Sequence, residues 1–113
     1  MISQAVVELS GSETTTILKN YFSEISGSYL LSVLPYYLSE ELKPRPQEHE
    51  KATLTGMFKK EDGFVDKNTP AVEVERKIRA FDEWPKLYTE IKGKRIQLLA
   101  SHFDETGNLV IDR

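Results

Sequence analysis

The pattern of apolar and polar positions changes several times along the first part of the chain. Residues 2–9 alternate in part and are rich in β-branched side chains, which predicts a strand. The apolar residues that follow recur at helical spacing, which predicts a helix that begins after Ser10 or Ser12 and ends at Gly27. Residues 28–39 are apolar around most of a helical circumference, so we expect a second helix there, with packing partners on more than one side.

A polar, proline-containing stretch separates this part of the chain from the rest. Residues 43–51 include Pro44 and Pro46, which cannot continue a helix and which favour extended backbone. The sequence therefore predicts a first domain at residues 1–42, a linker at 43–51 and a second domain at 52–113.

The second domain is predicted to contain one short helix and several antiparallel strands, which makes the expected fold class α+β. Thr69 followed by Pro70 is typical of a helix start, with Thr69 as the N-cap residue, and Trp84-Pro85 ends the helix. Two apolar segments flank a Lys-Gly-Lys turn and indicate a hairpin, and a later turn leads to a last strand. The helix should bury Ala71, Val74, Ile78 and Phe81, and the strands should lie at 87–91, 95–101 and 109–111.

Composition limits the chemistry that the chain can carry. The absence of cysteine excludes disulfides, thiolate catalysis and cysteine-bound metals, and the two histidines lie too far apart to suggest a zinc site. No segment approaches the roughly 20 apolar residues of a membrane helix, and no signal peptide is recognisable. We therefore expect a cytoplasmic protein without a metal site or a membrane partner.

Charge is distributed unevenly between the two predicted domains. The net charge of −3 combines −4 on residues 1–42 with +1 on residues 43–113. A protein that binds a polyanion needs a basic face, and only the second part of the chain could supply one.

Basic residues in the second domain are candidates for contacts with nucleic-acid phosphates, which Lys and Arg make without reading sequence. Three of them are expected on the exposed side of the short helix, where ion pairs with Glu73 and Glu75 are the alternative. Three others crowd the hairpin turn, and two precede the Glu61-Asp62 turn. Trp84 could stack on a base, but its place beside the apolar stripe favours a core or hinge role. The candidates are Lys59, Lys60, Arg76, Lys77, Arg79, Lys92, Lys94 and Arg95.

The second domain contains four short motifs: Lys-Glu-Asp-Gly-Phe-Val-Asp at 60–66, Ile-Arg-Ala-Phe at 78–81, Trp-Pro at 84–85 and Gly-Lys at 93–94. In this order and spacing they resemble the C-terminal domain of methionyl-tRNA formyltransferases. Shorter matches upstream resemble the last strand, the closing helices and the linker of that family's N-terminal domain. The sequence departs from the family at Lys67, where an aromatic residue is common, which affects only local packing.

The resemblance implies a fold for each predicted domain. Residues 1–42 would be the closing strand and helices of a Rossmann-type formyltransferase domain, and residues 52–113 would be an incomplete OB-like barrel. The sequence stops at Asp112-Arg113 inside an expected strand, so we expect a truncated domain. Exposed strand edges recruit other chains, which predicts dimer formation or strand exchange.

The resemblance also implies a function. Members of the family transfer a formyl group from 10-formyltetrahydrofolate to initiator methionyl-tRNA, using an Asn-x-His element and an Asp of the N-terminal domain. None of Asn20, Asn68 and Asn108 is followed two places later by His. We therefore expect no catalytic residue and no cofactor in this chain, which should be inactive alone and should contact initiator methionyl-tRNA.

Two other functions stay open at this point. The chain could be the equivalent region of a sugar or other small-molecule N-formyltransferase, which would share the turn and the hairpin. It could also be a stand-alone interaction module. The Ile-Arg-Ala-Phe and Trp-Pro motifs favour the tRNA enzyme over the small-molecule enzymes. The end of the sequence inside an expected strand argues against a stand-alone module.

Overall fold

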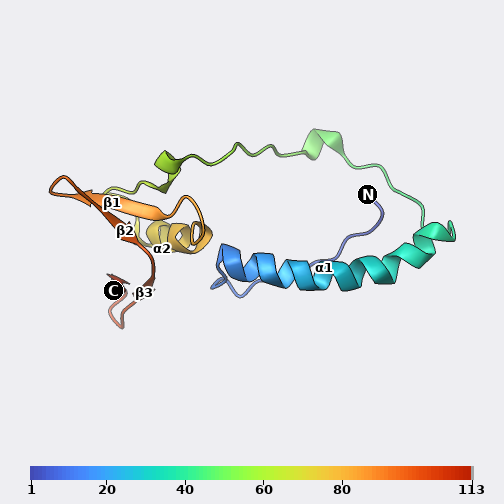
Figure 1. The fold of residues 1–113 in the computed structure, drawn as a ribbon, viewed down its shortest axis with the longest axis horizontal. Coiled ribbons are helices and arrows are strands. Elements are labelled where there is room, and N and C mark those ends of the chain that lie inside the picture. Colours follow the sequence, from blue (N-terminus) through green and yellow to red (C-terminus); the bar gives the residue numbers. More distant parts are fainter. Residues whose placement is uncertain (113) are drawn as a thin grey trace.

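The computed structural model describes residues 1–112, which form two helices, two 3₁₀ turns and two antiparallel strand pairs (Figure 1). The predicted α+β class is confirmed. Arg113, the last residue of the predicted second domain, lies outside the described residues. The elements are α1 (Thr15–Leu38), η1 (His49–Lys51), η2 (Lys60–Gly63), α2 (Ala71–Ala80), β1 (Leu87–Ile91), β2 (Lys94–Leu98), β3 (Ser101–Phe103) and β4 (Leu109–Ile111).

The first helix is longer than the sequence predicts. α1 runs without interruption through Gly27 and Pro35, so the prediction of two helices separated at Gly27 is wrong. A glycine inside a helix costs only about 1 kcal/mol relative to alanine, which an otherwise continuous helical pattern can tolerate. The N-cap is Thr14 rather than Ser10 or Ser12, because the Thr14 hydroxyl accepts a hydrogen bond from the Ile17 amide at 3.3 Å.

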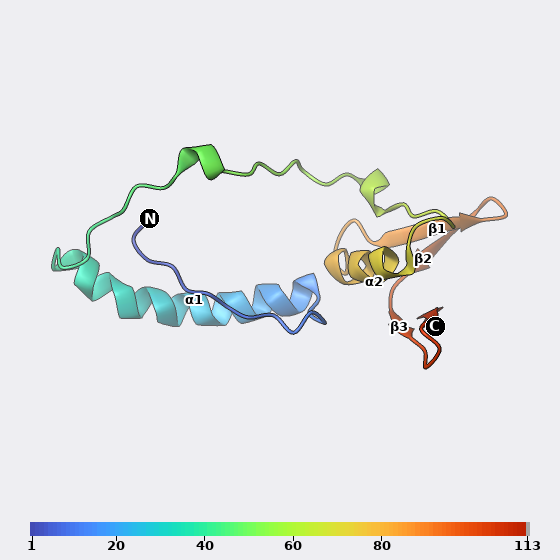
Figure 2. The ribbon, with the colours of Figure 1, turned by 180° about the vertical axis from the view of Figure 1, so that it is seen from behind.

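The segment before α1 is extended but is not a strand, so the prediction of a strand at residues 2–9 is wrong. A strand exists only where a neighbouring chain segment pairs with it, and no such ladder forms among residues 1–112. Instead, the backbone of Met1 exchanges two hydrogen bonds with that of Arg45, each 2.8 Å long. Figure 2 shows this segment running beside α1.

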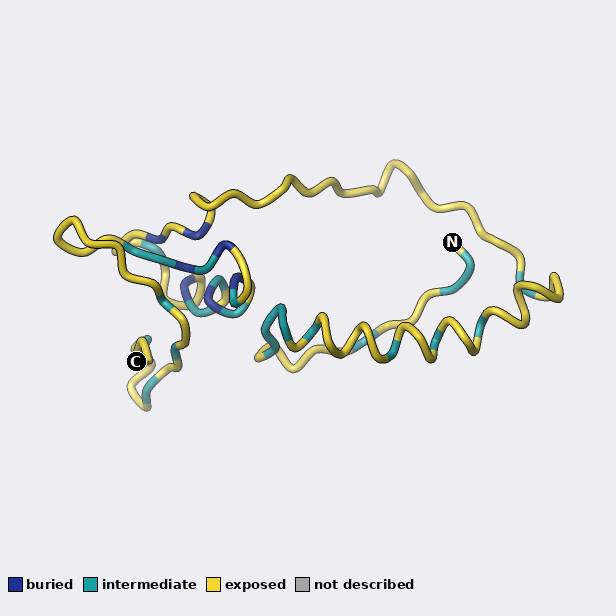
Figure 3. The backbone as a smooth tube through the Cα atoms, viewed as in Figure 1, coloured by how far each residue is buried: buried dark blue, intermediate teal, exposed yellow. Residues whose placement is uncertain are grey.

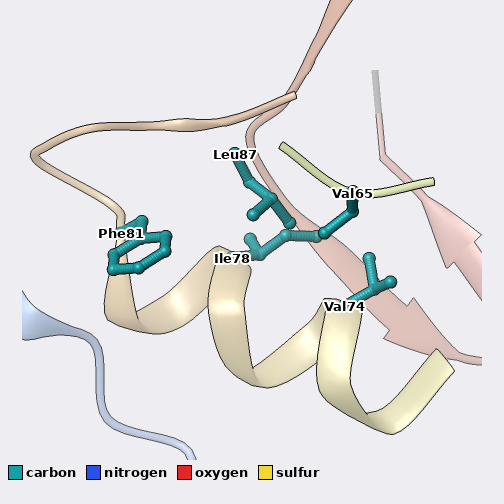
Figure 4. Packing of buried hydrophobic residues seen from close by; sticks show 5 residues of the cluster. All are labelled: Val65, Val74, Ile78, Phe81 and Leu87. Carbon is teal, nitrogen blue, oxygen red and sulfur yellow. The ribbon is translucent and has the colours of Figure 1, made fainter. Parts of the chain in front are cut away.

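We call the part of the chain from η2 to β4, residues 60–111, the C-terminal unit. The core of the molecule lies in this unit, between α2 and β1 (Figure 4). Its helical positions follow the predicted stripe, except that Ala71 is exposed. Thr69 does not cap α2, because its hydroxyl bonds to Asp66 and the N-cap position is taken by Pro70. The buried apolar residues are Val65, Val74, Ile78, Phe81 and Leu87.

The predicted hairpin is confirmed, with β1 and β2 antiparallel and joined at Lys92-Gly93. Both turn residues have positive φ, 51° and 72°, which is the requirement of a type I′ turn. The expected strand at 95–101 is divided between β2 and β3, and β3 pairs separately with β4. Within residues 1–112 these two-stranded sheets do not close into a barrel, and self-association through their open edges stays a prediction.

The molecule is much more extended than a compact chain of this length. Its radius of gyration is 19.6 Å, whereas a compact domain of this size would have about 13 Å. Figure 3 shows the cause: burial is confined to the C-terminal unit, and α1 contains no buried residue. Thus α1 projects along the long axis and contributes nothing to the core.

α1 is nevertheless attached to the C-terminal unit at its first turn, which lies beside the end of α2 in Figures 1 and 2. We call this contact the junction. Hydrogen bonds cross it in both directions, from α1 to carbonyl and carboxylate oxygens and from α2 back to the segment before α1. They are Thr15 Oγ1 to Ala80 O at 2.7 Å, the Thr16 amide to the Asp82 carboxylate at 3.2 Å, Thr16 Oγ1 to Glu83 Oε1 at 3.3 Å, Lys19 Nζ to Glu83 Oε2 at 2.6 Å and Arg79 Nη1 to Glu13 O at 3.0 Å.

Candidate nucleic-acid interface

The tip of the β1–β2 hairpin carries the densest group of predicted site residues. Lys92, Lys94 and Arg95 are all exposed, and the tip lies at one end of the long axis (Figure 1). Among residues 1–112, none of the three forms an ion pair. The tight type I′ turn therefore holds three cations together with their charges available to a ligand.

Arg95 has a partner of another kind. Its guanidinium carbon lies 3.4 Å from the centre of the Tyr88 ring, which is a cation–π contact. The Phe64 ring packs against the Tyr88 ring, and the centres of the two rings lie 5.6 Å apart. The sequence analysis missed Tyr88 and Phe64, although the hairpin register, with Arg95 diagonal to Tyr88, could have indicated the first of them.

Gly63 holds the 60–66 turn against the base of the hairpin. A Cβ atom on this buried glycine would lie 2.2 Å from the carbonyl oxygen of Lys86, so only glycine allows the approach. The next residues then follow β1, with a bridge from Phe64 to Tyr88 and a 2.9 Å hydrogen bond from the Val65 amide to the Tyr88 carbonyl. This glycine thus positions Phe64 beside the hairpin.

Lys59 and Lys60 lie at the start of η2, on an element separate from the hairpin tip. Both side chains are exposed. The Lys59 amide donates to the Asp62 carboxylate at 2.6 Å, and Glu61 is adjacent. These two carboxylates weaken the local positive potential, so the pair is a weaker phosphate site than the hairpin tip.

The predicted basic face of α2 is mostly neutralised by its own acids. Lys77 pairs with Glu73 at 2.7 Å, which confirms one of the two i,i+4 pairs indicated by the sequence. Arg76 is exposed and forms no ion pair within residues 1–112. Of the three candidates on α2, Arg76 is therefore the one with a charge available to a ligand.

Arg79 does not lie on an exposed face, so that prediction is wrong. Its side chain is only 23% exposed, and its guanidinium bonds to both oxygens of Glu75 at 2.5 and 3.0 Å and to the Glu13 carbonyl. The hydrogen bond from Arg79 lowers the pKa of Glu75, and the same contact raises the pKa of Arg79. Arg79 is a structural residue of the junction.

Trp84 was expected to have a core or hinge role, and at 57% exposed it does not lie in the core. Phe81 and Leu87, which flank it in the sequence, are buried in the core. A hollow of about 530 Å³ between the hairpin and α2 is lined mainly by apolar side chains.

His49 lies in η1 and His102 on β3, and the described residues contain no group of three metal-binding side chains.

Comparisons with known proteins give the class of this unit. Residues 57–110 match the family "Formyl transferase, C-terminal domain", a range that contains all the basic candidates and all four motifs. The chain therefore carries a formyl transferase C-terminal domain.

Relatives over nearly the whole chain narrow the class further. The chain is 40% identical over 99 residues to a methionyl-tRNA formyltransferase of Chloroflexus aurantiacus, which covers 88% of the chain and 32% of that protein. It is 38% identical over 107 residues to the methionyl-tRNA formyltransferase of Treponema pallidum, an alignment that covers 95% of the chain and 34% of that protein. It is 41% identical over 86 residues to the methionyl-tRNA formyltransferase of Myxococcus xanthus, which covers 76% of the chain and 28% of that protein. The chain corresponds to the C-terminal domain region of methionyl-tRNA formyltransferases.

Two facts bound this assignment. The chain spans about a third of the length of the relatives that it matches. None of the helices in the described residues has the length and apolar character needed to cross a membrane.

Proposed function

We propose that this chain is the tRNA-contacting C-terminal part of a methionyl-tRNA formyltransferase-like protein, which formylates initiator methionyl-tRNA for translation initiation in the cytoplasm. The observation that carries the proposal is the cationic hairpin tip inside a domain whose relatives bear that enzyme name. Exposed lysine and arginine without ion pairs are suited to phosphate oxygens, which the tRNA backbone presents throughout.

The contacts would be made without reading sequence. Lys92, Lys94 and Arg95 would supply the main phosphate contacts, and Arg76 would add one from α2. Lys59 and Lys60 would contribute less, because Glu61 and Asp62 stand beside them. Lys77 would act only if tRNA displaced Glu73.

We place the formyl-transfer chemistry outside the described residues. General acid–base catalysis needs titratable groups that converge in one pocket. The hollow between the hairpin and α2 is lined mainly by apolar side chains, and the two histidines lie on separate elements. The residues present therefore do not fit 10-formyltetrahydrofolate, and no catalytic step is assigned to them.

The test is a titration of the chain with initiator tRNA and with an elongator tRNA over a series of salt concentrations. The proposal predicts Kd values of roughly 10⁻⁴–10⁻⁶ M at physiological salt and a linear fall of log K with log salt concentration. Both tRNAs should bind alike, because phosphate contacts carry no sequence information. Absence of binding at low salt would contradict the proposal and favour the small-molecule formyltransferase alternative.

A further inference from the structure

We infer that Arg95, Tyr88 and Phe64 form a stacking site for an unpaired nucleobase on the outer face of the β1–β2 hairpin. The inference rests on the proposed function, because it adds a second kind of RNA contact beside the phosphate contacts of the same hairpin. It assigns a role to two aromatic residues that phosphate binding leaves without one.

The three side chains form a continuous layer. The Arg95 guanidinium carbon lies 3.4 Å from the centre of the Tyr88 ring, and the Phe64 ring centre lies 5.6 Å from it on a tilted plane. The backbone fixes this arrangement through the Phe64–Tyr88 bridge and through the diagonal position of Arg95 in the hairpin register. Phe64 and Arg95 are exposed, so the layer is accessible from solvent.

Arg95 does not use the carboxylate that the hairpin offers it. The register places Glu90 directly opposite Arg95, where an ion pair would be the ordinary cross-strand contact. Within residues 1–112, the Arg95 guanidinium has neither an ion pair nor a hydrogen bond, and it lies instead over the Tyr88 ring. Its N–H groups stay available, and its orientation is already restricted, which reduces the entropy lost when a ligand binds.

The chemistry of this layer suits a base better than a phosphate. A phosphate needs positive charge, which Lys92 and Lys94 supply at the same tip. Aromatic rings and guanidinium planes offer flat surfaces, and unpaired bases stack on both. Cations beside a stacking surface are the combination that proteins use to bind single-stranded nucleic acid. The ligand class is therefore an unpaired nucleotide of an RNA, such as those of tRNA loops and ends.

The decisive variant is Arg95→Lys, which keeps the charge but removes the guanidinium plane. Its binding is measured with a single-stranded RNA of roughly eight nucleotides, within the usual site size, and with a duplex of the same sequence. We expect about tenfold weaker binding of the single strand, an unchanged salt dependence and unchanged binding of the duplex. Tyr88→Leu should weaken single-strand binding by a similar factor, after Trp84 fluorescence has established that the variant is folded.

Lys94→Gln is the matched control, because it removes one charge and no stacking plane. It should lower the slope of log K against log salt concentration by about one for both RNAs. Equal single-strand binding by Arg95→Lys and the unmodified chain would overturn the stacking site and leave the phosphate role standing. Failure of the unmodified chain to bind either RNA at low salt would overturn the proposed function, and the stacking site with it.

Discussion

The two ends of the molecule are stabilised in different ways. The C-terminal unit has its own core, centred on Leu87, which is 1% exposed. α1 is more than twice as long as α2 but buries no residue and exposes large apolar side chains such as Leu31. An isolated helix is marginal in water, so α1 depends on the junction at its first turn and on whatever covers its apolar sides. Autonomous stability therefore belongs to the C-terminal unit.

The same two regions differ in charge. Lys19 is the one basic residue of the first 42, and it is paired with Glu83 across the junction. The C-terminal unit instead holds Lys92, Lys94 and Arg95 on a tight turn, and none of them forms an ion pair within the described residues 1–112. The part of the chain with its own core is thus also the part to which we assign polyanion binding.

The largest predicted effect comes from removing core volume. Leu87→Ala should lower the free energy of unfolding by about 2–5 kcal/mol, because it empties the centre of a small core. Leu31→Ala, the control in α1, should change it by no more than about 0.5 kcal/mol. Chemical denaturation followed by Trp84 fluorescence and circular dichroism measures both, and similar losses in the two variants would mean that α1 also belongs to the core.

Substitution of two glycines by alanine should change the stability of the two regions in opposite directions. Gly63→Ala should destabilise the C-terminal unit by about 1–3 kcal/mol, because the new Cβ would meet the Lys86 carbonyl at 2.2 Å. Gly27→Ala should stabilise α1 by roughly 0.5–1 kcal/mol, because a Cβ there meets no atom within 4 Å and alanine favours the helix. Thermal unfolding of both variants checks the signs, and a stabilised Gly63→Ala protein would contradict the close packing of η2 on β1.

Loss of the Arg79 contact with Glu13 should loosen the junction without unfolding the C-terminal unit. Arg79→Gln removes the hydrogen bond to the Glu13 carbonyl, and we expect the junction to lose on the order of 1 kcal/mol. Hydrogen exchange should accelerate at the amides of Thr16 to Leu18, while the Leu87 amide keeps its protection. Arg76→Gln is the control, because Arg76 lies on the same helix and takes no part in the junction.

Acidification should weaken the junction as well. Hydrogen bonds from Ser10 and nearby amides lower the pKa of Glu13 to about 2. Burial acts to raise the pKa of Asp82, but hydrogen bonds from Thr14 and Thr16 outweigh it and leave that pKa below its usual range. A carboxyl group with a lowered folded-state pKa stabilises the fold above its unfolded-state pKa, and this contribution disappears as the pH falls through the folded value.

The lowered folded-state pKa of Glu13 sets the pH range over which its stabilisation is lost. For Glu13, stabilisation is complete above about pH 4.5 and is lost as the pH falls toward about 2. The Ser10 and Gly11 amides donate to the Glu13 carboxylate in the turn before α1, so their hydrogen exchange should rise over this range relative to exchange at Leu87. Substitution of Glu13 by Gln should flatten the pH dependence, and an unchanged profile in that variant would contradict the role assigned to Glu13.

Local pattern was sufficient where a structure depends on neighbouring residues. The alternation around Lys92-Gly93 predicts the hairpin, and the stripe that includes Val74 and Ile78 predicts the buried face of α2. The Glu73–Lys77 and Glu75–Arg79 pairs also follow from spacing alone. The motifs at 60–66 and 78–81 identified the family that the comparisons support.

The errors occurred where contacts distant in sequence decide the structure. A strand at residues 2–9 needs a partner that the pattern of one segment cannot supply. Arg79 was expected to be exposed, but its guanidinium donates a hydrogen bond to the carbonyl of Glu13, which precedes α1 and lies far from Arg79 in the sequence. The contact of Phe64 with Tyr88 depends on the fit of Gly63 against Lys86, which spacing does not reveal.

The most direct test of the assignment of RNA binding to the C-terminal unit is to neutralise three cations at a time and to measure tRNA binding. Substituting Lys92, Lys94 and Arg95 by Gln should lower the slope of log K against log salt concentration by about three, one for each phosphate contact. A control variant with the same change in net charge should bind as the unmodified chain does, and it carries Gln at the exposed linker positions Lys43, Arg45 and Lys51. Equal losses in the two variants, or no loss at the hairpin, would contradict the assignment of RNA binding to the C-terminal unit.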